Sequence, residues 1–580
     1  MWISQSRPYS LFSLLFKPRL FKHGVWGLGI GLLQAAIALS PPTAKPAQAA
    51  EKIIFYLGAG VERSLSVDSL TLYAKQGIIN EELSAYLPYL GQIDAATLNQ
   101  AREILTERVD TDVTTVSQFS YTEQGEHILQ QTGEIFRTGS RLSGAKGLRG
   151  AAILSAADPE EGLTLLNVIR RFPTPVLRVD IRKGTAIARQ FDAAFQQSDT
   201  ALQLVEQLSL ARATEDLPGD TSAIRLTQLV TEPGPFQVRR QPLRVKASER
   251  PIDIYIPITN FFNSSMQRKD FVWPAVVISH GLGNDRNTYA YLAEFLAEHG
   301  FAVINIEHRG SSDEQLSGLI AGFRNEVVSA DEFISRPQMI SQVLDELEQR
   351  DDLLEKGSGR IDFNNIGVIG QSFGGYTALA VAGAPLNLEQ LRTDCPLTEL
   401  SFNVSLLLQC QAIDIAEENS FTTDFSFRDP RIRAAIAINP ITSKLFGPES
   451  LAKIDIPLML VAASNDTIAP ALPEQIRPFT WLTTPDHYLL VMQGATHFST
   501  IDITGTETFQ LPPAVVGPHP EIAQDYTQAM SLAFLNTYIK GEEQYAAVLT
   551  SAFTTRFSEP EIPLSLISEL TPEQLATQLK

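Results

Sequence analysis

Cysteine is nearly absent from this sequence, which has only Cys395 and Cys410 among 580 residues. The two are too far apart to form a Cys-x-x-Cys pair, so the redox and zinc motifs built on that spacing are excluded. Two cysteines that close a short loop predict a disulfide if the chain matures in an oxidising compartment. Two buried free thiols are the alternative.

Positive charge is also scarce. The sequence has 46 Lys and Arg against 66 Asp and Glu, a formal net charge of −20 and a pI near 4.9. Such a balance argues against nucleic acid or an anionic membrane surface as the main partner. With 44% hydrophobic residues, the composition is typical of a soluble globular protein with enough apolar material for a large core.

The first fifty residues lack acidic side chains. A basic stretch precedes the apolar run 24–39, and Ala47-Gln48-Ala49 follows it. This is the order of regions in a secretory signal peptide. A membrane anchor is the alternative, but the run is short for a span of about 20 residues. We therefore expect export to the periplasm or the medium, with cleavage near Ala49 of a signal peptide covering 1–49.

Residues 50–215 contain no cluster of His, Cys or paired carboxylates at ligand spacing, and we interpret His127 as a surface or capping residue. The pattern predicts a mainly helical domain after one short strand at 53–57. Ser66 is expected to cap a helix that runs to Gln76, with Gly77 beyond its end, and Asp94 another that reaches about 108. Further helices are expected at 122–136, 148–156 and 160–171, with a linker at 213–222.

Residues 216–545 show a different pattern, in which short apolar runs alternate with helical stretches. This alternation predicts an open, mostly parallel sheet with helices on both faces, which is an α/β fold. The expected strands are 236–245, 252–256, 275–279, 301–306, 366–369, 434–438, 458–462 and 488–492. The expected helices are 292–299, 337–349, 376–382 and 524–539. The insertion 385–428, which contains both cysteines, is interpreted as a lid, with a decorative surface insertion as the alternative. Residues 546–580 are expected to form a C-terminal tail.

A candidate nucleophile lies in the stretch Gly370-Gln371-Ser372-Phe373-Gly374, directly after strand 366–369. The pattern Gly-x-Ser-x-Gly is weak alone, but a strand before it and a helix after it are the context of a nucleophile turn. Glycines let the strand and the helix approach closely. The alternative is a glycine-rich turn without chemistry.

A serine nucleophile needs a base and an acid that orients the base. In this kind of fold they follow the serine in the order Asp or Glu, then His. His497 comes just after strand 488–492, whereas His487 opens that strand and His519 lies between prolines. Asp466 follows strand 458–462. We therefore expect Ser372, Asp466 and His497 to form a catalytic triad, with an Asx-turn cap as the alternative role of Asp466.

Acyl transfer also needs hydrogen-bond donors for the oxyanion. The amide of Phe373, the residue after the nucleophile, is expected to supply one. The loop 279–283, which follows strand 275–279, is expected to supply the other through the amide of Leu282, and His280 to shape this loop. The expected substrate contacts are Tyr289, Gly281, Gly283 and the side chain of Phe373.

The stretches SHGLG and FAVINIEHRGSS, together with GQSFGG, resemble the secreted platelet-activating-factor acetylhydrolases of the α/β-hydrolase superfamily. The segments SNDTIAP and GATHFS look more like those of bacterial cutinase-type polyesterases, in which the acid also follows the later strand. The acetylhydrolases place their acid after the strand that ends here in Asn439. The opening YLGAGVERSLSVDSL is similar to an uncharacterised helical domain that precedes hydrolases in cyanobacterial exported proteins.

The residues and the resemblance together predict a secreted serine esterase that works through an acyl-enzyme, without a metal or an organic cofactor. Short-acyl esters of lipids or phospholipids are the class that the resemblance suggests, with transient membrane contact at most. The alternatives are an acyltransferase, a serine peptidase of the same fold, or a binding protein that has lost catalysis. The N-terminal domain is expected to modulate substrate access.

Overall fold

The computed structural model describes residues 49–57, 61–86, 94–215, 220–248, 250–258, 272–350, 353, 359–395, 400–418, 425–502 and 513–580. The predicted signal peptide thus lies outside the described residues, apart from Ala49. The chain divides into a smaller unit (Met1–Gln196, Ser317–Val327 and Thr398–Phe402) and a larger unit (Gln197–Leu316, Val328–Leu397 and Asn403–Lys580). Within the described residues, no helix is both long enough and apolar enough to cross a membrane.

The smaller unit contains a four-stranded sheet in the order β2-β1-β4-β3, so the expectation of a single strand was wrong. The strands are β1 (Lys52–Leu57), β2 (Val61–Ser66), β3 (Phe136–Thr138) and β4 (Val176–Val179). β1 pairs in parallel with β4, more than a hundred residues along the chain, and in antiparallel with β2. Strands this short carry little signal of their own, and only their distant partners complete the sheet.

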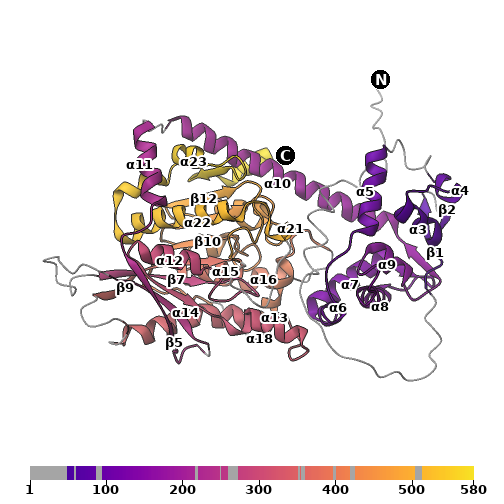
Figure 1. Cartoon of the computed structure of the whole chain (residues 1–580), viewed down its shortest axis with the longest axis horizontal. Helices are drawn as coiled ribbons and strands as arrows, with labels where there is room; N and C mark the ends of the chain where they lie inside the picture. The colour runs from indigo at the N-terminus through magenta and orange to yellow at the C-terminus, as the bar shows by residue number, and fades with distance from the viewer. Residues whose placement is uncertain are drawn as a thin grey trace. The chain divides into compact units, whose positions relative to one another are not determined.

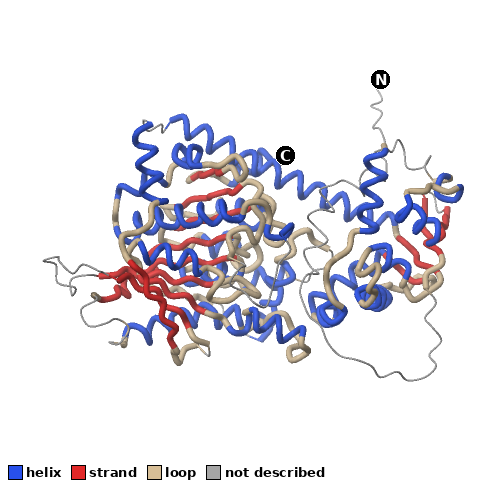
Figure 2. Tube along the Cα trace, viewed as in Figure 1, coloured by secondary structure: helices blue, strands red, loops and turns tan. Residues whose placement is uncertain are grey.

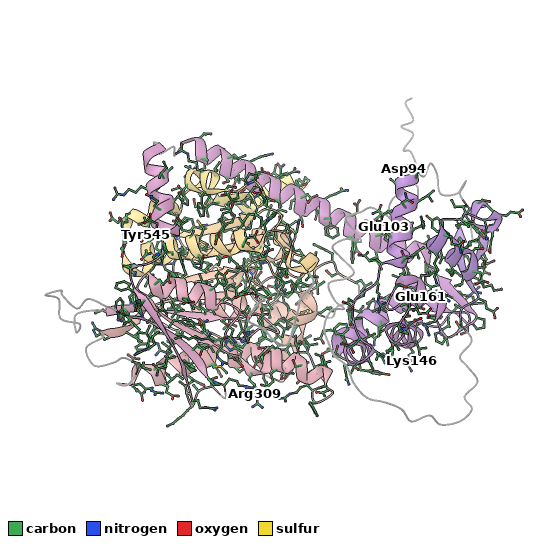
Figure 3. All side chains as sticks on the ribbon, in the orientation of Figure 1. Asp94, Glu103, Lys146, Glu161, Arg309 and Tyr545 are labelled. Atoms are coloured by element: carbon green, nitrogen blue, oxygen red, sulfur yellow. A yellow bond between two sulfur atoms is a disulfide. The ribbon has the colours of Figure 1, made fainter. Side chains whose placement is uncertain are left out.

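Helices make up the rest of this unit, as expected. They are α3 (Val67–Gln76), α4 (Glu81–Ser84), α5 (Ala95–Thr106), α6 (Val113–Ser120), α7 (Glu123–Ile135), α8 (Ala145–Ala156) and α9 (Leu165–Arg170). The predicted caps are confirmed: the Ser66 side chain accepts from the Ser69 amide, and Asp94, labelled in Figure 3, accepts from Thr97. Gly77 ends α3 with φ +72°, a conformation that favours glycine.

The larger unit is built on a nine-stranded sheet in the order β13-β12-β11-β10-β9-β7-β8-β6-β5. The strands are β5 (Gln237–Leu243), β6 (Ile252–Ile258), β7 (Val272–Ser279), β8 (Ala302–Ile306), β9 (Arg360–Gln371), β10 (Ile432–Ile438), β11 (Leu458–Ala463), β12 (His487–Met492) and β13 (Leu564–Ile567). The neighbours from β12 to β8 pair in parallel, and β5, β6 and β13 add antiparallel edges. The predicted mostly parallel sheet is confirmed.

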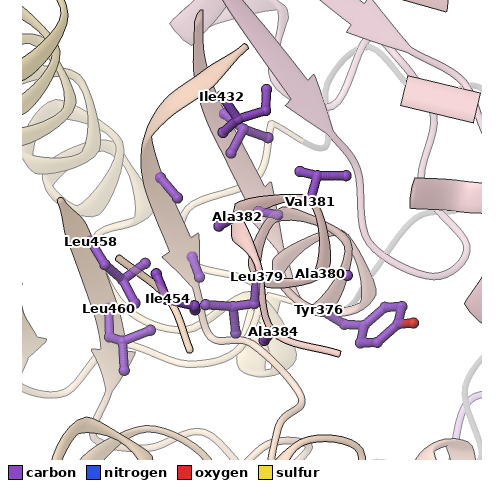
Figure 4. Close-up of a cluster of buried hydrophobic side chains, with 14 of the residues drawn as sticks. Tyr376, Leu379, Ala380, Val381, Ala382, Ala384, Ile432, Ile454, Leu458 and Leu460 are labelled. Carbon is purple, nitrogen blue, oxygen red and sulfur yellow. The ribbon is translucent and has the colours of Figure 1, made fainter. Parts of the chain in front are cut away.

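Helices cover both faces of this sheet, as Figures 1 and 2 show. One face packs against α14 (Glu332–Glu348) and α15 (Phe373–Ala382), the other against α12 (Ala290–Glu298) and α22 (Pro520–Leu535). Figure 4 shows Leu379 and Ala382 of α15 in one buried cluster with Ile432 of β10 and Leu458 of β11. The remaining helices are α10 (Ile181–Glu215), α11 (Asp220–Thr231), α13 (Asp313–Ile320), α16 (Leu388–Asp394), α17 (Leu406–Gln409), α18 (Ile413–Glu418), α19 (Gly447–Leu451), α20 (Arg477–Phe479), α21 (Pro513–Val516), α23 (Ser551–Phe557) and α24 (Pro572–Gln578).

Two expectations about the chain between these elements need correction. The predicted linker 213–222 is helical at both ends, since α10 runs to Glu215 and α11 starts at Asp220. The segment 546–580, expected to be a tail, contributes the edge strand β13, whose Leu566 pairs with Leu490 of β12. Because β13 has only four residues, its pairing and not its own pattern makes it a strand.

Helix α14 begins at Glu332, five residues before the expected start at Pro337. Proline has no amide hydrogen, so inside a helix it leaves the carbonyl four residues earlier without its usual donor. Here that carbonyl belongs to Phe333, and the Tyr376 hydroxyl of α15 donates to it at 2.6 Å. A tertiary hydrogen bond therefore lets the helix continue through Pro337.

Candidate active site

Ser372 lies on a strained turn between β9 and α15, with φ +56° and ψ −115°. A Cβ on Gly370 would lie 1.9 Å from the Gly374 carbonyl oxygen, and one on Gly374 would lie 2.0 Å from the Ser279 oxygen. Both positions therefore require glycine, because a side chain would push the strand and the helix apart. This is the strand-to-helix turn that displays a nucleophile in α/β-hydrolase folds.

Asp466 and His497 form a buried pair at the same edge of the sheet. The His497 Nδ1 lies 2.6 Å from Asp466 Oδ2. The other carboxylate oxygen accepts from the amides of Ile468 at 2.8 Å and Ala469 at 2.7 Å. An ionised carboxylate can only accept, so this contact requires the hydrogen on Nδ1. In the neutral ring, that arrangement leaves on Nε2 the lone pair that a general base needs.

Two side chains bind the backbone at His497, and one of them belongs to the turn around Ser372. Gln371, next to Ser372, donates to the His497 carbonyl oxygen at 3.1 Å, and Asn439 donates to the same oxygen at 3.4 Å. No hydrogen bond joins the Ser372 hydroxyl to His497 among the described residues. Such contacts are often long in unliganded enzymes and shorten when substrate binds.

Asn439 and Gln371 were not predicted as functional residues. Asn439 directly follows β10 and has φ +43°, and its amide donates to Val461 of the next strand at 2.8 Å. The position after β10 is the one that the resemblance gives to the acid of acetylhydrolases, so it could have marked Asn439 as a site residue. The side-chain amide of Asn439 binds the carbonyl of His497, and it is uncharged where a carboxylate would be negative.

The loop 279–284 lies against the nucleophile turn. A Cβ on Gly281 would lie 2.3 Å from Gln371 Oε1 and 3.3 Å from Ser372 Cβ. Gly283 has φ +74°, and its amide donates to the Ser311 carbonyl at 2.8 Å. Phe373 is the first residue of α15, where amides have no acceptor within the helix. The segments that contain the Leu282 and Phe373 amides therefore both lie next to Ser372.

His280 fixes the orientation of this loop through a neutral ring. Its Nε2 accepts from the His308 amide at 2.9 Å, so the hydrogen is on Nδ1, which donates to the Gly281 carbonyl at 2.7 Å. That carbonyl shares a peptide plane with the Leu282 amide, whose hydrogen points the opposite way in a trans peptide. Burial, reinforced by the Arg336 charge, lowers the pKa of His280 to about 3.

His308 extends the same buried network beneath the loop. Its Nε2 lies 2.9 Å from the Ser279 hydroxyl, and its ring centroid lies 5.3 Å from that of His280. Burial holds the pKa of His308 well below its ordinary value, and the Arg336 charge adds to this shift. Both histidines are therefore neutral at physiological pH, which suits a structural role for them.

The two aromatic side chains among the expected substrate contacts are buried in the structure. The Phe373 ring is fully buried and packs against Phe333 and Tyr376 at centroid distances of 4.8 and 5.6 Å. The prediction that this side chain faces the acyl group is therefore wrong, because the first turn of α15 directs it into the core. Tyr289 is only 2% exposed, and its hydroxyl lies 2.9 Å from that of Thr500. Tyr289 thus supports the loop that follows His497.

The insertion 385–428 contains the predicted disulfide, Cys395–Cys410, which is confirmed. It is attached to the acid segment through Glu474, a fully buried carboxylate in the helical turn after Asp466. Glu474 accepts from Gln409 at 3.0 Å and from the Thr442 and Ser443 amides at 2.7 and 2.9 Å. The Ser405 amide also donates to the Ile468 carbonyl at 2.7 Å. The insertion is therefore packed against the loop that holds Asp466.

The described residues contain no group of three or more His, Cys, Asp or Glu side chains arranged to hold a metal ion. Ser372, Asp466 and His497 follow β9, β11 and β12 at the carboxyl edge of one sheet. This arrangement has the chain order and the position of the nucleophile, acid and base of an α/β-hydrolase.

Comparisons with known proteins agree with this class. Residues 254–320 match the family platelet-activating factor acetylhydrolase, isoform II. Residues 49–180 match the family described as an alpha/beta hydrolase of unknown function (DUF1400), although this stretch precedes the nine-stranded sheet. The resemblance to the α/β-hydrolase superfamily is thus confirmed.

Curated relatives point the same way. The chain is 23% identical to cutinase cut1 of Thermobifida fusca over 352 residues, which is 60% of this chain and 79% of the cutinase. It is also 23% identical to cutinase 2 of Thermobifida cellulosilytica, over 59% of this chain and 92% of that protein. A platelet-activating factor acetylhydrolase of Cavia porcellus is 23% identical over 52% of this chain and 66% of its own length.

Proposed function

We propose that this protein is a serine ester hydrolase that works through an acyl-enzyme. The observation that carries the proposal is the buried 2.6 Å contact between His497 Nδ1 and Asp466 Oδ2, at the sheet edge where Ser372 occupies its strained turn. The relatives named as cutinases and as a platelet-activating factor acetylhydrolase support an ester as the substrate.

In the first half of the reaction, the Ser372 hydroxyl oxygen attacks the ester carbonyl carbon while His497 Nε2 takes its proton. Asp466 holds the ring and stabilises the positive charge that forms on it. The Leu282 and Phe373 amides donate to the negatively charged oxygen of the tetrahedral intermediate. The intermediate then expels the alcohol, which receives the proton from His497, and leaves the acyl group on Ser372.

In the second half, water replaces the alcohol. His497 takes a proton from the water as its oxygen attacks the acyl carbon, and the same two amides hold the second oxyanion. Collapse of this intermediate returns the proton to Ser372 and releases the carboxylic acid.

We propose lipid or phospholipid esters with a short acyl group as the substrate class. The match of residues 254–320 to the acetylhydrolase family supports this choice, because these residues include the loop 279–284 beside Ser372. We also propose that the protein is exported, which the Cys395–Cys410 disulfide supports since disulfides persist in oxidising compartments. N-terminal sequencing of the protein from fractionated cells tests the export.

Turnover of p-nitrophenyl esters of increasing acyl length tests the activity, with labelling of Ser372 by a fluorophosphonate probe as a second readout. We expect a burst of p-nitrophenol, a rate that falls with acyl length, and loss of both turnover and labelling in Ser372→Ala. An inactive wild-type protein whose Ser372 also stays unlabelled would exclude the serine esterase mechanism. Accumulation of acylated alcohol in place of free acid would instead indicate an acyltransferase.

A further inference from the structure

One buried side chain, Arg336 of α14, contacts both segments that supply the proposed oxyanion donors, one through a backbone carbonyl and the other through an aromatic ring. It is fully buried. Its Nη2 donates to the His280 carbonyl, and its guanidinium carbon lies 4.5 Å from the centroid of the Phe373 ring. His280 orients the peptide that contains the Leu282 amide, and Phe373 contains the second amide.

Two further donor atoms of Arg336, Nε and Nη1, are buried and make no hydrogen bond to the described residues. The nearby Glu332 accepts from the hydroxyls of Ser311 and Ser335. Burial lowers the pKa of Arg336 to about 9, against the opposing effect of the Glu332 charge.

Such an environment is costly for a charged side chain. A buried charge with free donors destabilises a protein relative to an apolar side chain of similar volume. A helix that only needed to pack against Phe373 would therefore be better served by methionine. The guanidinium lies between the His280 carbonyl and the Phe373 ring, which suggests a role in the candidate oxyanion site.

We propose that Arg336 is a positioning residue of the oxyanion site. It keeps the His280 carbonyl and the Phe373 ring in the positions from which the Leu282 and Phe373 amides can donate to the same oxyanion. This inference rests on the proposed function. Without the guanidinium, the His280 carbonyl loses a hydrogen-bond donor and the Phe373 ring loses the cation that packs on its face. The His280 ring would then hold the Gly281 carbonyl less firmly, and the Leu282 amide would rotate away from the oxyanion.

Three variants test the proposal through kcat, KM and melting temperature. Arg336→Met removes the donor and the charge, and Arg336→Lys keeps the charge without the planar fork. Arg431→Met is the matched control, because Arg431 also donates to a carbonyl of α14, that of Ser341 at 3.1 Å, but lies at the opposite end of β10 from the site.

We expect Arg336→Met to lower kcat roughly 10- to 100-fold, less than the full loss of one oxyanion donor, with KM within about 3-fold of the wild type. Arg336→Lys should recover part of the loss. Arg431→Met should lower the melting temperature and leave kcat within about 2-fold. Equal kcat values for Arg336→Met and Arg431→Met would overturn the proposal.

A crystal structure of Arg336→Met separates this proposal from the proposed function. We expect the Gly281–Leu282 peptide to rotate and the Phe373 ring to shift. If both keep their wild-type positions, Arg336 does not position them, whatever the activity. If they move while the wild-type protein hydrolyses no ester, the proposed function fails and the positioning role stands.

Discussion

Two loops at the carboxyl edge of the large sheet each contain a buried histidine, and their surroundings make them different groups. After β7, His280 donates from Nδ1 to a peptide carbonyl and lies near the Arg336 guanidinium. After β12, His497 places the same ring atom 2.6 Å from a carboxylate. The neighbouring charge has opposite sign in the two loops.

This difference determines what each ring can do with a proton. A cation beside His280 and its complete burial disfavour imidazolium, so the ring stays neutral and serves as a fixed hydrogen-bonding spacer. A carboxylate beside His497 favours imidazolium, as the proposed role of this ring as the base requires. Two histidines at one edge of a sheet thus have surroundings that suit a proposed base and a neutral scaffold.

The largest expected effect comes from removing the base. His497→Gln should lower kcat roughly 10⁵- to 10⁶-fold, as loss of the base does in other serine hydrolases, because it removes the proposed acceptor of the Ser372 proton. Single-turnover kinetics on a p-nitrophenyl ester measure the residual rate. A loss below 100-fold would mean that another group serves as the base.

Removing the Asp466 charge should make the surroundings of His497 more like those of His280, which has no carboxylate partner in the part of the chain that the structure describes. Asp466→Asn keeps the shape of the side chain but removes the charge, and should lower kcat roughly 10⁴-fold. Asp455→Asn is the matched control, because Asp455 lies before β11 and its side chain is 77% exposed. Comparable losses in the two variants would remove Asp466 from the proposed mechanism.

Replacing the scaffold histidine should have a smaller effect. His280→Gln should lower kcat roughly 10- to 100-fold, since it loosens one oxyanion donor and leaves the base intact. The pH profile of kcat/KM should keep its shape, because His280 stays neutral in the folded protein. A changed profile in His280→Gln would show that His280 titrates during catalysis.

The smallest effect concerns stability at low pH. Burial lowers the pKa of His280 to about 3, below that of an unfolded histidine near 6.5, so the unfolded chain binds more protons between these pH values. Stability from this residue is therefore complete above pH ~6.5 and declines as the pH falls towards ~3. The melting temperature of His280→Gln should fall less between pH 7 and pH 4.5 than that of the wild type. Calorimetry that finds parallel declines would contradict the neutral state of His280.

Much of the site could be predicted because each part follows its own strand. The apolar runs before residues 370, 464 and 494 predict strands, and parallel strands bring their carboxyl ends to one edge. The caps Ser66 and Asp94 were also predictable, since a cap side chain accepts from a backbone amide only three residues later. Local patterns are sufficient where the interacting groups are close in sequence.

The unpredicted features all depend on distant partners. Pro337 marks a helix start in the sequence, but the Tyr376 hydroxyl satisfies the Phe333 carbonyl and the helix continues through it. Strand β13 exists because β12 is beside it. The Phe373 ring was expected to face the substrate, yet the turn of α15 buries it next to Arg336.

The sequence by itself determined the α/β class and the order of Ser372, Asp466 and His497 along the chain, because hydrophobic periodicity and strand-end positions are local properties. Only the tertiary structure decided which histidine lies beside a carboxylate and which beside a guanidinium. It also decided the direction of the Leu282 amide, through a ring that bonds two segments at once. The charge next to a ring depends on elements that meet only in the folded chain, and this is why two similar loops have different chemistry.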